Sequence, residues 1–135
     1  MRKKMKIASK IENLREVERV VDEVAIKYNL KNELYGNILI AFLEAVNNAI
    51  VHGNKLNEEK DVSIDIEINK GELHIIVKDQ GNGFDYNNVP DPTAPENIEN
   101  ISGRGIFLMK KLSDKVIFDE NGTKAELVFY LDKWK

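Results

Sequence analysis

Residues 42–54, FLEAVNNAIVHGN, combine the apolar spacing of a buried helix with an unusual number of polar side chains. Residues i and i+4 of a helix share one face, so Glu44, Asn48 and His52 form a polar stripe. Beside it runs an apolar set: Ile38, Phe42, Ala45, Ala49 and Ile50. A polar group without partners in a closed interior costs roughly 2–7 kcal/mol. We therefore expect the stripe to line a cleft, where a general base and a metal ligand can sit one turn apart.

Two plainer interpretations of this segment stay open. The stripe can be a solvated helix face that binds nothing. His52 can be a helix-end histidine stabilised by the helix dipole, because it precedes Gly53, which is a plausible C′ residue in the left-handed conformation.

The composition excludes several classes of protein. The 23 acidic and 20 basic residues give a net charge of −3, and only residues 2–4 form a basic run, so nucleic-acid binding has little electrostatic support. The chain has no cysteine, which excludes disulfides and thiolate zinc sites, and it shows no signal-peptide pattern. We expect one cytoplasmic domain over residues 1–135, with no membrane and no direct nucleic-acid partner.

Apolar periodicity predicts two helices in the first half of the chain. Residues 5–8 suit a short strand, after which Ser9 and Glu12 form a capping box for a first helix. Its apolar positions recur at helical spacing: Ile11, Leu14, Val17, Val21, Val24, Ala25 and Tyr28. The second helix is expected from an N-cap at Asn32 to Gly53. Arg15 and Arg19 lie on the exposed face of the first helix, and the sequence pattern leaves open whether they contact a partner.

Two hairpins are predicted in the second half, the first of them from alternating apolar residues. One pairs residues 62–68 with 73–77 around NKGE, and the other pairs 115–119 with 124–131 around ENGT. A third helix is expected at 106–112, after a long loop over 81–105. The fold class is therefore α+β: a two-layer sandwich with helices packed on one face of a mostly antiparallel sheet.

Two glycine-rich segments add to the polar stripe. In residues 79–85, DQGNGFD, the glycines let the backbone approach a ligand, and Asp79 is a fixed acceptor at a strand end. An EF-hand is excluded, because Gly81 stands at the third ligand position and no glutamate stands at the twelfth. In residues 102–108, SGRGIFL, a glycine pair runs into a helix, whose free N–H groups favour phosphate. Neither a P-loop nor the eukaryotic protein-kinase motifs occur.

The order and spacing of these segments resemble those of the GHKL ATPases, in which an N box, two glycine boxes and a lid surround ATP. Residues 44–54 resemble the N box, 79–85 the first glycine box and 103–105 the second, with a lid at roughly 86–102. The chain is most similar to the anti-sigma-factor serine kinases of the RsbW/SpoIIAB type, through EAVNNAIVHGN, VKDQGNGFD and PENIENISGRGIFLMKKLSDKV. This resemblance implies the GHKL, or Bergerat, ATP-binding fold.

The resemblance also implies roles for single residues. Asn48 would ligand a Mg²⁺ that bridges the ATP phosphates, and Glu44 would be the general base for an incoming serine hydroxyl. Asp79 would accept a hydrogen bond from the adenine amino group. The other residues that the resemblance assigns to nucleotide binding are His52, Gly81, Gly83, Phe84, Gly103, Arg104, Gly105 and Thr123.

The function implied by the resemblance is that of an ATP-dependent serine/threonine kinase and anti-sigma factor. Such a protein phosphorylates an anti-sigma-factor antagonist on serine, sequesters a sigma factor and forms a homodimer, here through the first strand and helix. The alternative is an ATP-binding module that sequesters a partner without phosphoryl transfer. A histidine kinase would need a phosphoacceptor histidine on a helical hairpin, and the only histidines are His52 and His74. A gyrase or MutL-type ATPase would need a transducer domain, for which 135 residues leave no room.

Overall fold

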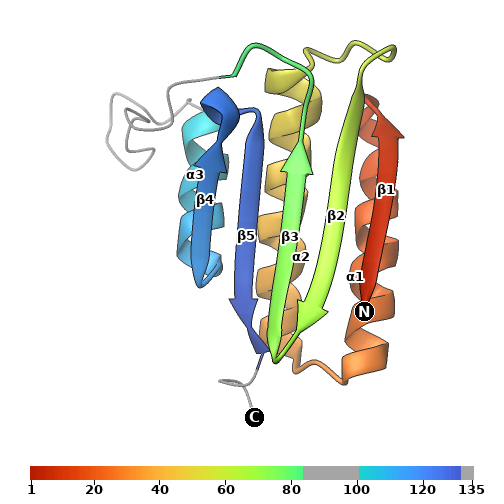
Figure 1. The fold of residues 1–135 in the computed structure, drawn as a ribbon, viewed down its shortest axis with the longest axis vertical. Coiled ribbons are helices and arrows are strands. Elements are labelled where there is room, and N and C mark those ends of the chain that lie inside the picture. Colours follow the sequence, from red (N-terminus) through yellow and green to blue (C-terminus); the bar gives the residue numbers. More distant parts are fainter. Residues whose placement is uncertain (84–100, 132–135) are drawn as a thin grey trace.

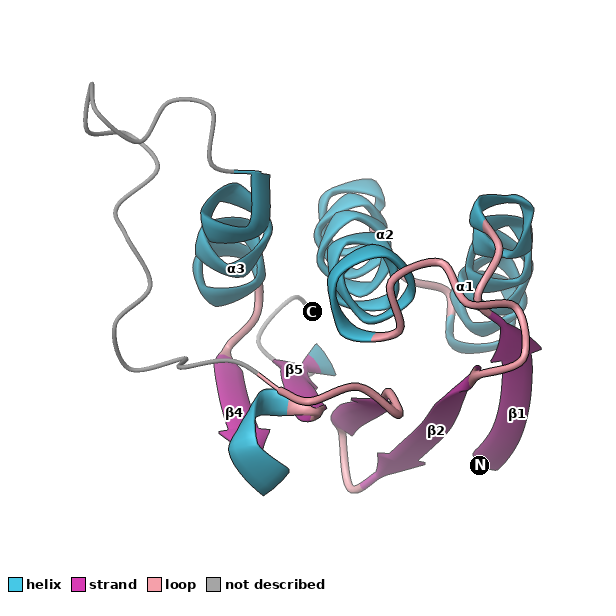
Figure 2. Cartoon of the chain, turned by 90° about the horizontal axis from the view of Figure 1, so that it is seen from above, coloured by secondary structure: helices cyan, strands magenta, loops and turns pink. Residues whose placement is uncertain are grey.

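The structure is a computed structural model that describes residues 1–83 and 101–131. Within these ranges, a five-stranded antiparallel sheet of order β1-β2-β3-β5-β4 carries three α-helices on one face (Figures 1 and 2). The strands are β1 Arg2–Ala8, β2 Asp61–Asn69, β3 Glu72–Lys78, β4 Lys115–Asp119 and β5 Lys124–Tyr130. The helices are α1 Leu14–Tyr28, α2 Asn32–Asn47 and α3 Ile101–Leu112. The predicted α+β sandwich is confirmed.

The central hairpin fixes which face of the sheet the helices cover. Residues of β2 and β3 alternate between buried and accessible, and the buried ones are Val62, Ile64, Ile66, Ile68, Leu73, Ile75 and Val77. Lys70 and Gly71, at the tip, both have positive φ, of 53° and 77°, as a two-residue type I′ turn requires. Because a slip of one residue would turn every apolar side chain to solvent, burial and turn together set the register.

Helix α2 lies between α1 and α3 over the middle of the sheet (Figure 2). All five apolar residues predicted for its buried face, Ile38, Phe42, Ala45, Ala49 and Ile50, are at most 4% exposed. By length and composition Asn32–Gly53 would pass for a membrane span, but here it is the core helix of the sandwich. Asn32 is the first helical residue and not the predicted N-cap, since Lys31 occupies that position without a side-chain cap.

The start of the first helix differs from the prediction. Ser9 does not cap it, because the chain first makes a 3₁₀ turn, Ile11–Asn13, and α1 begins only at Leu14. The Ser9 hydroxyl is buried and donates to the carbonyl of Lys60, 2.7 Å away, ahead of β2. Ile11 is 45% exposed and therefore lies outside the predicted apolar face. A tertiary hydrogen bond has replaced the local cap.

The end of α2 departs from α-helical geometry. Asn48–Gly53 forms a π-helical turn, and the Asn54 amide donates to the Ala49 carbonyl, five residues back, at 2.8 Å. Gly53 is not in the predicted left-handed conformation, and the residue that ends the turn, Asn54, has φ −86°. Single π-helical turns within helices are frequent at functional sites.

Helix α3 begins at Ile101, five residues before the predicted start, so Gly103 and Gly105 lie inside its first turns. The prediction that all of residues 81–105 form a loop is therefore wrong at its end. Residues 84–100, which contain Phe84 and most of the predicted lid, lie outside the described residues.

Candidate functional site

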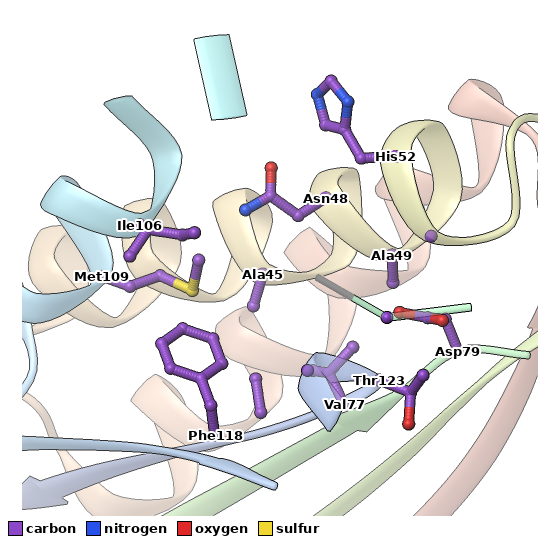
Figure 3. Close-up of a pocket in the computed structure, with 14 residues that line it drawn as sticks. Ala45, Asn48, Ala49, His52, Val77, Asp79, Ile106, Met109, Phe118 and Thr123 are labelled. Atoms are coloured by element: carbon purple, nitrogen blue, oxygen red, sulfur yellow. The ribbon is translucent and has the colours of Figure 1, made fainter. Parts of the chain in front are cut away.

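A cavity of about 120 Å³ lies where the π-helical turn and α3 meet the ends of β3, β4 and β5 (Figure 3). Much of its wall is apolar: Ala45, Ala49, Val77, Ile106, Met109, Phe118 and Ala125. The polar side chains in the wall are Asn48, His52, Asp79 and Thr123. An apolar slot with a few convergent polar groups is the usual form of a small-molecule site.

Asp79 follows β3 directly and is the buried charge of this cavity. It is 9% exposed, and its Oδ1 accepts a hydrogen bond from the Gly81 amide at 2.8 Å. Burial raises the pKa of Asp79, and this outweighs the Gly81 hydrogen bond and the charge of Lys60, which both lower it. Its own amide donates to the Thr123 carbonyl at 2.9 Å, which places Asp79 and Thr123 side by side (Figure 3).

Two glycines leave room for the Asp79 carboxylate. A Cβ on Gly53 would lie within 3.0 Å of three carboxylate atoms of Asp79, closer than real Cβ contacts come. A Cβ on Gly81 would collide with the backbone carbonyl of Gly53 in the same way. The sequence predicted Gly53 as a helix-end residue, whereas the structure makes it part of the packing around Asp79. No local pattern signals this contact, because it joins residues 26 positions apart.

Gly83 belongs to the same wall through a different contact. Its φ is +81°, and a Cβ there would collide with the carbonyl of Asn121, in the turn Glu120–Gly122 between β4 and β5. The segment after β3 therefore packs directly on this turn. Thr123 follows the turn, is half-buried and donates its hydroxyl to the Glu120 carbonyl at 2.8 Å.

A second polar group lies toward α3. The amide oxygen of Asn48 is buried and has no hydrogen-bond partner among the described residues. A Cβ on Gly105 would lie 2.9 Å from Oε2 of Glu44 and 3.2 Å from both terminal atoms of the Asn48 side chain. Glu44 and Asn48 therefore meet beside the Gly105 backbone, and glycine there lets α3 approach α2 this closely. His52 is exposed, and like Asn48 it points away from the sheet (Figure 3).

The structure brings most of the predicted site residues together, but not all of them. Glu44, Gly81 and Gly105 lie beside lining residues but are not part of the cavity wall. Gly103 is buried and Arg104 is exposed on the same turn of α3, and neither lines the cavity. Phe84 lies outside the described residues. Sequence reasoning missed the apolar wall, including Phe118 and Met109, since ordinary core residues build it.

Comparison with known proteins identifies the family of the chain. The chain matches the family described as "Histidine kinase-like ATPase domain" over residues 7–130, a range that contains every site residue named above. The chain belongs to the histidine kinase-like ATPase family.

Alignments with individual proteins cover less of the chain than the family match does. The chain is 35% identical over 102 residues to the serine-protein kinase RsbW of Staphylococcus epidermidis, and 33% identical over 102 residues to that of Staphylococcus aureus strains JH9 and Newman. Each alignment covers 70% of this chain and 64% of the relative. The chain thus spans somewhat less than two thirds of the relatives that it matches.

Proposed function

We propose that this protein is an ATP-dependent serine/threonine protein kinase and anti-sigma factor. It phosphorylates an anti-sigma-factor antagonist on serine and, in a separate complex, sequesters a sigma factor and so regulates transcription. Family membership and similarity to proteins named serine-protein kinase RsbW support this proposal. The observation that carries it is the buried amide oxygen of Asn48, which has no partner among the described residues; Asn48 lines the cavity, and the Glu44 carboxylate lies beside it at Gly105.

The Asp79 end of the cavity suits an adenine base. Asp79 presents a buried acceptor, which would receive a hydrogen bond from the exocyclic amino group of adenine. Guanine carries a carbonyl oxygen at that position, so it would leave the carboxylate facing another acceptor, which is a strong basis for discrimination. The apolar wall, with Val77, Met109 and Phe118, would cover the faces of the base, and Thr123 would support it beside Asp79.

The Asn48 end suits phosphate and a divalent cation. Leaving a buried amide oxygen unpaired costs about 1–3 kcal/mol, and a ligand that occupies this position removes the cost. Mg²⁺ takes oxygen ligands, few of them from the protein when phosphates and water supply the rest, so the Asn48 amide oxygen fits it. Bound there, Mg²⁺ would neutralise charge on the phosphates. We propose that the phosphates lie beside the start of α3, where the Gly105 backbone packs against Glu44 and Asn48.

We propose that Glu44 acts on the incoming hydroxyl. Its carboxylate would accept the proton of the substrate serine as the serine oxygen forms its bond to the γ-phosphorus and the bond to ADP breaks. Asn48, one turn along, would hold the phosphate end in line with that oxygen. Phosphoryl transfer depends chiefly on such positioning and on charge stabilisation.

The protein would act in the cytoplasm as a homodimer. Among the described strands β1 lies at one edge of the sheet, with α1 beside it, so both elements are available to a second copy (Figure 1). Sedimentation equilibrium measures this directly.

The kinase is tested by incubating wild-type, Glu44→Gln and Asn48→Ala protein with Mg²⁺ and γ-labelled ATP in lysate of the source organism. We expect a small protein to be labelled on serine by the wild type only. Glu44→Gln should retain ATP binding. Asn48→Ala should lose the part of the ATP affinity that depends on Mg²⁺. ATP-dependent capture of a sigma factor without labelling by any variant would favour the alternative, a binding module without phosphoryl transfer.

A further inference from the structure

Asn54 is a buried residue that neither the cavity wall nor the proposed chemistry includes. It is 1% exposed, yet its side chain makes three hydrogen bonds. The amide nitrogen donates to the Ser9 hydroxyl at 2.9 Å and to the Asp61 carbonyl at 3.1 Å. The amide oxygen accepts from the backbone N–H of Gln80 at 2.7 Å. Asn54 therefore connects the chain after β1, the start of β2 and the residue that follows Asp79.

The orientation of this amide is fixed by its partners. The Gln80 N–H can only donate and the Asp61 carbonyl can only accept, so a flipped amide would place donor against donor and acceptor against acceptor. The Ser9 hydroxyl accepts a hydrogen bond from Asn54 and donates one to the Lys60 carbonyl at 2.7 Å. Every hydrogen-bonding group in this buried set has a partner, which is the condition under which such a network holds one conformation.

Gln80 is held by two hydrogen bonds of this network, one through its backbone and one through its side chain. Besides the bond from its backbone to Asn54, its side-chain oxygen accepts from the Asp61 amide at 2.7 Å. Gln80 lies between Asp79, whose amide is held by Thr123, and Gly81, whose amide is held by the Asp79 carboxylate. Three successive N–H groups of this wall are thus anchored, and Asn54 supplies the middle anchor.

We propose that Asn54 is a positioning residue of the nucleotide site, an inference that rests on the function proposed above. Asn54 ends the π-helical turn that carries Asn48, and it holds the strand end that carries Asp79. It thereby fixes the distance between the phosphate end and the adenine end of the cavity. It also ties that distance to β1 through Ser9.

The expected effect depends on the fraction of free protein molecules in which residues 79–81 keep the arrangement that binds the nucleotide. Asn54→Ala leaves the Gln80 N–H, the Asp61 carbonyl and the Ser9 hydroxyl without their partner, so the free protein samples other arrangements of residues 79–81. Apparent affinity falls by the fraction of molecules that keep the binding arrangement. If that fraction drops to about one in ten, the affinity for ATP falls about tenfold. Preference for ATP over GTP should fall too, because a displaced Asp79 no longer discriminates between the bases.

The test is isothermal titration of Mg·ATP and Mg·GTP into the full chain. The matched control is Asn57→Ala, in the same loop, where the side chain is exposed and accepts only from the nearby Glu59 amide at 3.0 Å. A second control is Ile68→Ala, a buried residue at the end of β2 opposite Asp61, which lowers stability without touching the site. Both controls should keep wild-type affinity and selectivity.

Wild-type affinity and ATP preference in a folded Asn54→Ala protein would overturn the inference, and so would equal losses in Ile68→Ala. If Asn54→Ala does not fold, Ser9→Ala carries the test, since it removes only the hydroxyl that accepts from Asn54. A smaller loss in the same direction is expected, and unchanged binding would refute the role of the network. Absence of ATP binding by the wild type would instead refute the proposed function.

Discussion

Replacing Gly53 by alanine should damage nucleotide binding by displacing the Asp79 carboxylate. Gly53 lies in the π-helical turn without positive φ, so its backbone accepts alanine without strain. The added methyl group, however, would lie within 3.0 Å of three atoms of the Asp79 carboxylate, where ordinary contact begins at 3.4 Å. Gly53 lines the cavity, and the overlap that the added methyl group creates there falls on Asp79.

The size of the effect follows from the required displacement. Relieving the overlap moves the carboxylate by roughly 1 Å, and misplacement of that order can cost about 100-fold in a preorganised site. The carboxylate cannot move this far and keep its 2.8 Å hydrogen bond from Gly81. A hydrogen bond to a charged group contributes about 1.5–3 kcal/mol, so loss of the adenine contact weakens ATP binding roughly 10- to 150-fold. Overpacking should also lower the free energy of unfolding by about 1–3 kcal/mol.

Isothermal titration with Mg·ATP and Mg·GTP measures the loss, and urea unfolding measures the stability. The control is Gly36→Ala, in the same helix, because no atom lies within 4 Å of a Cβ at that position. Gly36→Ala should raise the free energy of unfolding by about 0.5–1 kcal/mol through helix propensity and leave binding unchanged. Binding by Gly53→Ala within twofold of wild type, with the same preference for ATP, would refute the assignment of Asp79 to adenine.

Two further substitutions test buried and paired charges. Asp79→Asn should reduce the preference for ATP over GTP in titrations, yet raise the thermal stability of the free protein at pH 8. Its folded-state pKa is raised by burial, so the ionised carboxylate opposes folding above that pKa, whereas an asparagine oxygen still accepts from Gly81. His74→Gln should lower the free energy of unfolding at pH 6, and should lower it by less at pH 8.5. Burial lowers the pKa of His74, but hydrogen bonds to Glu126 and Glu72 outweigh it and raise the pKa above 6.5. The folded state therefore holds the proton more tightly, and this stabilisation is lost as pH rises through the raised pKa.

Each of these predictions has a clear contrary result. Equal thermal stability of wild-type and Asp79→Asn protein would show that the buried charge costs the free protein nothing. For His74, urea unfolding at pH 6 and 8.5 gives the comparison. A difference in stability that stays constant between the two values would show that the protonated histidine contributes no pH-dependent stability.

Local patterns in the sequence predicted most of the fold. Alternation in the hairpin of β2 and β3 and the apolar spacing of α2 were sufficient for these elements, because both depend on residues a few positions apart. The sequence also placed Glu44 and Asn48 on one helical face and Asp79 at a strand end. It could not show that these groups share a cavity with Met109 and Phe118, since apolar wall residues look like any other core residue.

Only the tertiary structure decided the features that depend on distant contacts. Gly53 reads as a helix terminus, but it is a glycine because the Asp79 carboxylate packs against it. Ser9 reads as an N-cap, but its hydroxyl accepts from Asn54, 45 residues away. The π-helical turn and the early start of α3 carry no signal of their own, because they arise where helix ends meet strand ends and a neighbouring helix. Sequence periodicity records which face of an element is buried, whereas these features depend on which atoms lie across that face.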